Sequence, residues 1–199
     1  MKARPILAAG KTFLFLLSCQ LLSLLSSAQV HYTGSSVDLV VSGTSTLHDW
    51  SMRSLKAECS ALFTVNPSGS ITGVQTMTFS TPAIGLKSEH TSMDNNAYKA
   101  LKTDKNPTIN YTLTSATVVP GANGTATVKC TGNLSIAGTT KEEEIVATCK
   151  PNADNTITVT GTRKINMPEF SIAPPTFMLG AVKTGSDVVI TFTMLLKRS

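Results

Sequence analysis

Most of this sequence alternates apolar and polar residues in short segments, and this period of two constrains the fold more than any other feature. Successive side chains of an extended chain point to opposite faces, so the pattern predicts β-strands with one apolar face each. Turn-forming stretches such as NPSG, VVPGANG, AGTT and PNADN separate the segments. About eight strands are predicted in this way, at residues 36–45, 55–65, 71–79, 108–114, 125–136, 142–149, 156–161 and 187–196.

The links between these segments are short, which favours antiparallel pairing between sequence neighbours. Eight antiparallel strands with one apolar face each can close into a barrel or fold as a sandwich. The apolar faces mix large side chains with Ala, Gly and Cys, and aromatic residues make up only 6% of the chain. A sandwich core of this size would need more aromatic residues. We therefore predict an all-β fold, an eight-stranded antiparallel barrel with room inside for a small ligand.

One segment, residues 92–102, breaks the series of strands and has the spacing of a helix. Ser92 is a candidate N-cap, and Asp94 falls in the first turn. The KNP sequence that follows ends the helix before the next strand. The barrel is therefore predicted to carry one short helix, whose apolar positions are Ala97, Tyr98 and Leu101.

The N-terminus has the layout of a secretory signal peptide, with basic residues first, an apolar run next and small residues last. The apolar run, residues 13–25, is shorter than the roughly 20 residues of a membrane-spanning helix. Cleavage is predicted after Ala28, because Ser26 and Ala28 are small enough for a signal peptidase. We therefore predict a signal peptide at residues 1–28 and a single barrel domain at residues 29–199.

The net charge of +5 belongs largely to the predicted signal peptide, which holds three of the 17 basic residues and none of the 12 acidic ones. No basic cluster remains in the mature domain, so nucleic-acid binding is not expected. No other apolar run is long enough for a stable membrane span. The predicted product is therefore a periplasmic or secreted protein, either a monomer or a homodimer.

The candidate catalytic residues do not form a recognised motif. The histidines at positions 31, 48 and 90 lack the spacing of a helical metal site, and there is no G-x-S-x-G stretch. The cysteines of the mature domain lie on the apolar faces of their strands, where a thiol behaves as a small apolar group. We therefore predict that the chain is not an enzyme and has no metal or cofactor.

The stretch GTSTLHDW, residues 43–50, is the one that most resembles part of an active site, because His48 and Asp49 precede the only tryptophan. If the strand stays regular here, His48 and Trp50 share one face and Asp49 points the other way. The two side chains would then not face each other as a catalytic pair. We interpret the stretch as a corner of the barrel, with Trp50 as a wall or gate of the cavity.

Three cysteines, Cys59, Cys130 and Cys149, remain in the predicted mature domain. No CxxC pair is present, so a zinc site or a thioredoxin-type site has no support. If the link at AGTTK is tight, Cys130 and Cys149 lie nearly opposite each other on neighbouring strands, close to disulfide distance. A Cys130–Cys149 disulfide is therefore one candidate, and two buried thiols are the alternative.

The segment 167–179 is unusual because it combines apolar residues with prolines. Pro168, Pro174 and Pro175 cannot donate hydrogen bonds to a sheet, so the segment is not a central strand. A loop this apolar either plugs the barrel or lines the entrance to an apolar pocket. Its methionines suit the second role, because they adapt to flexible ligands.

Taken in order, four stretches of the mature domain resemble the YceI-like, polyisoprenoid-binding family, in the branch common among exported bacterial proteins. They are SGTSTLHDW, LKSEHTSMDNNAYKALKTDKNPTINYTL, GNLSIAGTTKEEEIVA and INMPEFSIAPPTFMLGAVKTGSDVVITFTM. The resemblance implies a lipocalin-like, eight-stranded barrel whose apolar interior takes a polyisoprenoid chain, such as a quinone tail or a prenyl lipid. It also implies a periplasmic or secreted location and no catalytic residues.

The resemblance supplies no ligand-contact motif that can be transferred residue by residue. The candidate lipid-binding residues are therefore chosen from the apolar faces given by the strand and helix periodicity, and from the apolar loop. They are Trp50, Phe63, Phe79, Leu101, Tyr111, Leu134, Ile136, Met167, Phe170, Phe177, Met178 and Phe192. Polar groups near the mouth would select the head group, and Trp50, Tyr98 and Tyr111 are the candidates for that role.

The sequence therefore predicts an exported binding protein that carries or sequesters a polyisoprenoid or a similar long apolar lipid. Two alternatives remain open. The first is a stress-response or interaction protein of the same fold, with a plugged cavity and a protein partner. The second is an enzyme that acts on a small hydrophobic substrate through His48 and Asp49.

Overall fold

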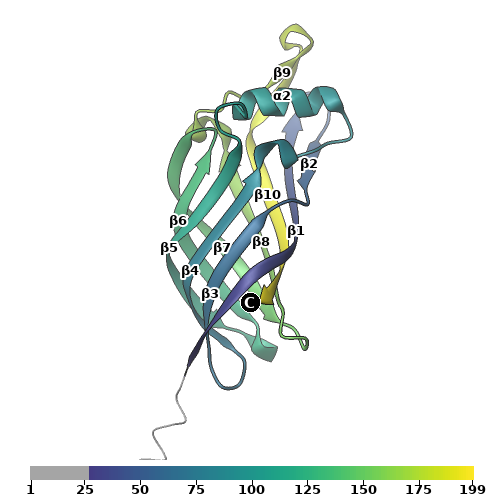
Figure 1. Cartoon of the computed structure of the whole chain (residues 1–199). Coiled ribbons are helices and arrows are strands. Elements are labelled where there is room, and N and C mark those ends of the chain that lie inside the picture. The colour runs from purple at the N-terminus through teal and green to yellow at the C-terminus, as the bar shows by residue number, and fades with distance from the viewer. Residues whose placement is uncertain (1–26) are drawn as a thin grey trace, which may run out of the picture.

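The structure is a computed structural model that describes residues 27–199, and it shows a closed antiparallel β-barrel (Figure 1). Each wall strand pairs with the next long strand along the chain, and β1 pairs with β10 to close the barrel. The eight wall strands are β1 (Ala28–Ser45), β3 (Glu58–Val65), β4 (Ile71–Pro82), β5 (Thr108–Pro120), β6 (Ala126–Ile136), β7 (Thr139–Pro151), β8 (Ile157–Asn166) and β10 (Val182–Arg198). The eight-stranded barrel with one helix predicted from the sequence is thus confirmed for this part of the chain.

The predicted signal peptide falls almost entirely on residues 1–26, which lie outside the described residues. The first strand begins at Ala28, one residue before the predicted start of the mature domain.

The remaining elements lie mainly at the ends of the barrel. β2 (Trp50–Ser54) pairs with the second half of β1, and β9 (Thr176–Phe177) pairs with the start of β10. The helix α2 (Thr91–Leu101) crosses one end of the barrel, called the upper end below (Figure 1). Short 3₁₀ turns complete the set: η2 (Ala83–Gly85), η3 (Ala122–Gly124), η4 (Met167–Phe170) and η5 (Met178–Gly180).

The helix α2 begins at Thr91, two residues before the start that an N-cap at Ser92 predicts. His90 occupies the N-cap position and makes no side-chain capping bond, so the prediction that Ser92 is the cap is wrong. The first turn is held instead by Asp94, whose carboxylate accepts hydrogen bonds from the backbone and side chain of Ser88. Within residues 27–199, no helix is long and apolar enough to cross a membrane.

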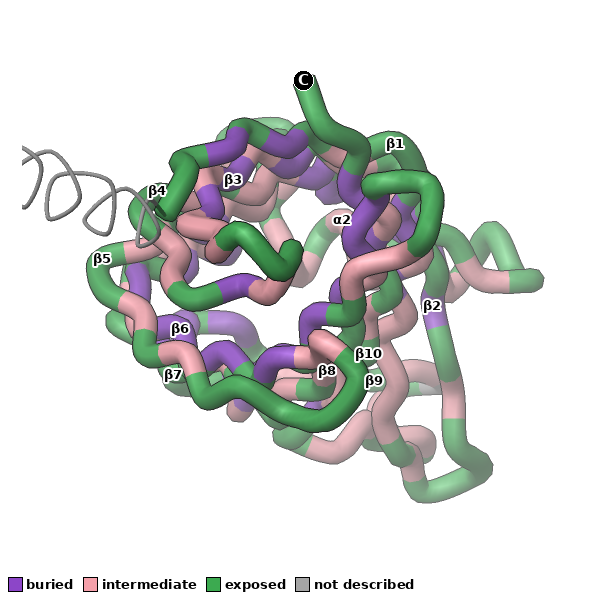
Figure 2. The backbone as a smooth tube through the Cα atoms, turned by 90° about the horizontal axis from the view of Figure 1, so that it is seen from below, coloured by how far each residue is buried: buried purple, intermediate pink, exposed green. Residues whose placement is uncertain are grey.

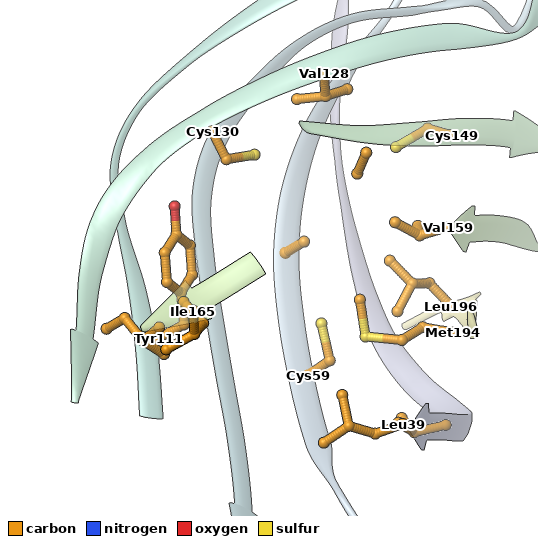
Figure 3. Packing of buried hydrophobic residues seen from close by; sticks show 14 of the residues in the cluster. Leu39, Cys59, Tyr111, Val128, Cys130, Cys149, Val159, Ile165, Met194 and Leu196 are labelled. Atoms are coloured by element: carbon orange, nitrogen blue, oxygen red, sulfur yellow. The ribbon is translucent and has the colours of Figure 1, made fainter. Parts of the chain in front are cut away.

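The interior of the barrel is lined by the inward-facing residues of each strand. Along many of the strands, buried residues alternate with more exposed ones, as the colours of the backbone tube show (Figure 2). The lower half is filled by side chains, which include an edge-to-face pair between Tyr32 and Phe63 with ring centres 5.6 Å apart. Figure 3 shows further side chains that converge on this interior from different strands, among them Leu39, Val128 and Leu196.

Polar side chains bridge β7 and β8 toward the upper end. The two strands pair only between Ala147–Gly161 and Pro151–Ile157. Above these pairs, Arg163 makes an ion pair with the buried Glu143, and its Nε lies 3.0 Å from a carboxylate oxygen of Glu143. The wall is therefore joined here by side chains rather than by backbone hydrogen bonds.

The β6–β7 turn sets the register of the two strands that carry Cys130 and Cys149. Ala137 and Gly138, the two residues of the turn, both have positive φ, as a type I′ hairpin requires. This register places Cys130 opposite Ile145 and Cys149 opposite Ala126, so the two cysteines are four positions out of alignment. The predicted disulfide therefore does not form in this structure, and the described cysteines are free.

The GTSTLHDW stretch is a hairpin and not one regular strand. β1 ends at Ser45, and β2 begins at Trp50 and returns alongside it, with Gly43 paired to Trp50. The side-chain oxygen of Ser45 accepts hydrogen bonds from the backbone of Leu47 and His48 within the turn. The proposed alternation from residue 44 to residue 50 is therefore interrupted, although the stretch does form a corner at the upper end.

The three described thiols are buried inside the barrel, and Figure 3 shows them among the apolar side chains of the core. Burial raises the pKa of the Cys59 and Cys130 thiols to about 11, and burial is also the main reason why the pKa of Cys149 rises to about 12. A thiol held in this way stays protonated when the same group in the unfolded chain would ionise. The unfolded state then binds fewer protons, so stability falls as pH rises above about 9 and towards the folded pKa values.

Alkylation of the mature protein tests this arrangement. At pH 8 the folded protein should take up iodoacetamide at Cys59, Cys130 and Cys149 far more slowly than the urea-unfolded protein, because the reactive thiolate is both scarce and inaccessible. The urea midpoint should also fall between pH 8 and pH 11. Mass spectrometry measures the labelling, and a disulfide-linked peptide that contains Cys130 and Cys149 would contradict the register described above.

Candidate functional site

A cavity of about 320 Å³ lies in the upper half of the barrel, beneath α2. Of its 24 lining residues, 19 are apolar. The walls come from β1, β5, β6, β8 and β10 through short aliphatic side chains: Val41, Ile109, Ile136, Ile165, Val188 and Ile190. The helix provides a roof through Met93, Ala97, Ala100 and Leu101.

The apolar loop after β8 contributes residues both to the core and to the lining of the cavity. Phe170 is fully buried and packs in the core, with Lys141 Nζ 6.0 Å from the centre of its ring. Met167, Ile172 and Phe177 from the same segment line the cavity. The two roles that the sequence left open for this segment are therefore divided among its residues.

Polar contacts join α2 to residues 84–88 of the segment that connects β4 to the helix. The Asp94 carboxylate is buried and accepts hydrogen bonds of 2.7 Å from both the backbone N–H and the hydroxyl of Ser88. Burial opposes the ionised form of Asp94, but these bonds and the nearby Lys87 outweigh it and lower the pKa of the carboxyl. The Tyr98 hydroxyl points to the backbone carbonyls of Ile84 and Leu86, at 3.0 and 2.9 Å.

Polar lining residues are confined to the segments around the mouth. Ser45 and His48 belong to the β1–β2 hairpin, His90 and Ser92 to the start of α2, and Thr184 to the start of β10. His48, His90 and Ser92 are exposed to solvent. The cavity is therefore apolar inside and offers polar contacts only at its rim.

The His48–Asp49 pair is not arranged for catalysis. His48 Nδ1 lies 2.7 Å from the backbone carbonyl oxygen of Asp49, so the ring contacts the main chain and not the carboxylate. Among the residues that the structure describes, no group of three or more His, Cys, Asp and Glu side chains is placed to hold a metal ion.

The three polar groups predicted to select a head group all have partners within the protein. The Trp50 indole N–H donates to the carbonyl of Thr44 at 3.1 Å, and its ring lies over Gly43. The Tyr98 hydroxyl is bonded as described above, and the Tyr111 hydroxyl lies 3.4 Å from the carbonyl of Glu143. Of these three residues, Trp50 is the one that lines the cavity.

The predicted lipid-binding residues divide into several groups. Those that line the cavity are Trp50, Leu101, Ile136, Met167 and Phe177. Those buried in the core outside it are Phe63, Leu134 and Phe170. Phe79 and Tyr111 line a second pocket, and the partly buried Phe192 lies over Gly161. The side chain of Met178 lies outside the described part of the structure.

The second pocket is larger, at about 500 Å³, but it suits an apolar ligand less well. Seven of its twelve lining residues are Thr, Ser, Asn or Glu. We therefore take the cavity under α2 as the candidate site.

Several residues of the site were not predicted to contact a ligand. Ile109 and Ile190 were placed on apolar strand faces, and Ala97 on the apolar face of the helix, but strand phase does not show which inward residues border a void. The candidates were chosen by inward position on the strands and from the apolar loop, and neither criterion shows where side chains are short enough to leave a cavity. The relevant signal was the row of Ile, Val and Ala at inward positions near the upper end of the strands.

The sequence matches the YceI-like domain family over residues 28–196. The structure resembles the crystal structure of BcnA from Burkholderia cenocepacia, with a TM-score of 0.64 and 12% identity over 80% of this chain and 95% of that chain. A polyisoprenoid binding domain from Saccharophagus degradans, implicated in plant cell wall breakdown, matches with a TM-score of 0.61 and 10% identity over 86% of this chain and 100% of that chain. The YCEI protein of Campylobacter jejuni matches with a TM-score of 0.52 and 19% identity, over 72% and 84% of the two chains. These structural matches show a shared fold, and no curated protein sequence matches this chain.

The contact between Trp50 and Gly43 provides a test of the site geometry. A β-carbon at position 43 would lie 2.5 Å from Trp50 Cζ2 and 2.8 Å from Cε2, so Gly43→Ala must displace the ring. We expect a loss of about 1–3 kcal/mol of stability. A red shift of the emission of Trp50, the only tryptophan, should accompany it. Ser42→Ala, at the neighbouring position, serves as the control, and an unchanged emission spectrum in Gly43→Ala would contradict the contact.

Proposed function

We propose that this chain, which belongs to the YceI-like domain family, binds an apolar lipid of the polyisoprenoid class inside its barrel and acts as a carrier or a sequestering protein. The observation that carries the proposal is the cavity of about 320 Å³, whose lining is apolar at 19 of 24 positions. The family match and the similarity to a polyisoprenoid binding domain support the same ligand class.

The binding energy would come from the transfer of apolar surface out of water. Each Å² of apolar surface buried contributes about 25 cal/mol, or about 0.8 kcal/mol for each CH₂ group. Ordering a flexible chain offsets part of that gain. Since the inner walls offer almost no hydrogen-bonding groups, the site would recognise an apolar shape, and a polar atom forced into it would lose its hydration without compensation.

The rim would contact the head group. His48, His90 and Ser92 lie where the cavity meets solvent, and each can donate or accept a hydrogen bond. A hydroxyl or a quinone carbonyl at the end of the ligand would therefore be placed at the mouth, with its tail directed down the barrel. A lipid bound in this orientation needs a cavity that opens to solvent. A plugged barrel that binds a protein partner would need no such opening.

Fluorescence of Trp50 gives a direct assay, because this residue lines the cavity and is the only tryptophan. Titration of delipidated protein with a quinone analogue that has a ten-carbon tail should change the emission in a saturable way. Ala97→Phe should weaken binding at least tenfold, because the larger side chain would occupy space under the roof.

Asn95→Phe is the matched control for Ala97→Phe, since Asn95 is on the same helix but is exposed and does not line the cavity. This variant should bind within about twofold of the unmodified protein, because it leaves the cavity volume unchanged. Mass spectrometry of organic extracts from purified protein provides an independent check. If no lipid is extracted and the emission of Trp50 does not respond to the analogue, the proposed function is wrong.

We also propose that the protein is exported and acts outside the cytoplasm. The layout of residues 1–28 supports this location. Expression of the full chain in a bacterial host should give a mature protein that begins at Gln29, recovered from the periplasm or the medium. Intact-mass measurement and N-terminal sequencing check the site, and an unprocessed chain in the cytoplasm would contradict the proposal.

A further inference from the structure

We infer that the site accepts a short apolar chain of about two or three isoprene units, and that the ring of Phe192 sets this limit. The inference rests on the proposed function and specifies its ligand by length. It follows from the volume of the cavity, from the residues directly beneath it and from the packing of the lower barrel.

The volume of the cavity gives the first limit. A protein cavity of about 150 Å³ holds one benzene molecule, which has six carbon atoms. By the same ratio, a cavity of about 320 Å³ holds about 13 carbon atoms. An isoprene unit has five carbons, so two or three units occupy the space and a longer chain exceeds it.

The lining stops at a definite level of the barrel. Val41 and Ile190, which face each other on β1 and β10, line the cavity. The next inward pair below them, Leu39 and Phe192, does not. On the other side of the barrel, Ile109 and Ile136 line the cavity, whereas Tyr111 and Leu134, which pair two residues further down, do not. The floor residues are therefore Leu39, Tyr111, Leu134 and Phe192.

Two glycines on neighbouring strands make room for the rings of the aromatic floor residues. Gly161 pairs with Phe192, and a β-carbon at position 161 would collide with the Phe192 ring. Gly132 has the same relation to Tyr111, since a β-carbon there would lie 2.7 Å from Tyr111 Cζ. Leu39, Tyr111 and Leu134 are buried, but Phe192 is only partly buried. Phe192 is therefore the floor residue that can be removed with the least damage to packing.

Buried side chains occupy the barrel below the floor, but the second pocket of about 500 Å³ also reaches Cys59 and Tyr111 there. Seven of its twelve lining residues are Thr, Ser, Asn or Glu, so an apolar chain would gain little by entering it. Cys59, Cys130, Cys149 and Met194 point into the region below the floor (Figure 3), and the Tyr32–Phe63 pair lies nearer the lower end. A chain longer than the cavity must therefore leave its excess units at the mouth, in contact with water. Those units would add little to binding, because affinity comes from apolar surface that is removed from water.

The experiment measures affinity along a series of prenyl alcohols with 10, 15 and 20 carbons, each kept below the concentration at which it aggregates, with Trp50 emission as the signal. The dissociation constant should fall at least tenfold from 10 to 15 carbons and less than threefold from 15 to 20. A further tenfold fall from 15 to 20 carbons would overturn the inference and leave the proposed function intact. If none of the alcohols binds, both fail.

Phe192→Ala tests the role of the floor. It should open the cavity downwards, so that the 20-carbon alcohol binds at least tenfold more tightly than the 15-carbon alcohol. Phe63→Leu is the control, because Phe63 lies in the lower barrel away from the cavity. In this variant the dissociation constant should still fall less than threefold from 15 to 20 carbons. Phe192→Leu replaces the alanine variant if the latter does not fold. If a folded Phe192 variant still binds the 15-carbon and 20-carbon alcohols within threefold of each other, Phe192 does not set the length of chain that the cavity accepts.

Discussion

The antiparallel pairing of β1 with β10 is the contact on which the rest of this structure depends. β1 has 18 residues and β10 has 17, and their pairs extend from Tyr32–Arg198 to Ser45–Thr184. These strands lie at opposite ends of the described chain, so their pairing bears the entropy cost of closing the longest loop in the fold. Closure removes the two free edges that an open sheet would expose, and it converts eight one-sided apolar faces into a single interior.

A closed wall encloses a volume that side chains then have to fill. In the lower half they include aromatic and sulfur-containing residues such as Tyr32, Phe63 and Met194, which are buried in the core. In the upper half the inward positions are short aliphatic residues, and the roof helix contributes Ala97 and Ala100. None of these side chains reaches the centre. The cavity is therefore a consequence of how side-chain size is distributed along the barrel. Asp94 and Tyr98 fix the roof helix to the segment that connects it to β4.

The strands and the helix could be predicted from the sequence, because they rest on local periodicity. The closed barrel was predicted on other grounds, which were the short links between strands, the low aromatic content and the resemblance to the YceI-like family. Register did not follow in the same way. The Cys130–Cys149 alignment depended on which residues form the β6–β7 turn, and Ala137, which is not a glycine, adopts positive φ there. The hairpin at Ser45 similarly interrupts an alternation that looked continuous. In both cases a few backbone dihedral angles shift the partners of a whole strand.

The sequence by itself therefore determined which residues face inward and that the inward faces together make one apolar interior, because the alternation of side chains along a strand is a local property. Ile136 could be assigned to the cavity wall on that basis, and the loop that holds Met167 could be recognised as apolar. Only the tertiary structure decided which inward residues border the cavity and which pack as core. Leu134 and Ile136 have the same phase on one strand, yet only Ile136 lines the cavity. The difference depends on the size of the side chains that the other strands, the roof helix and the apolar loop place at the same height in the barrel. Those side chains belong to residues far apart in the sequence.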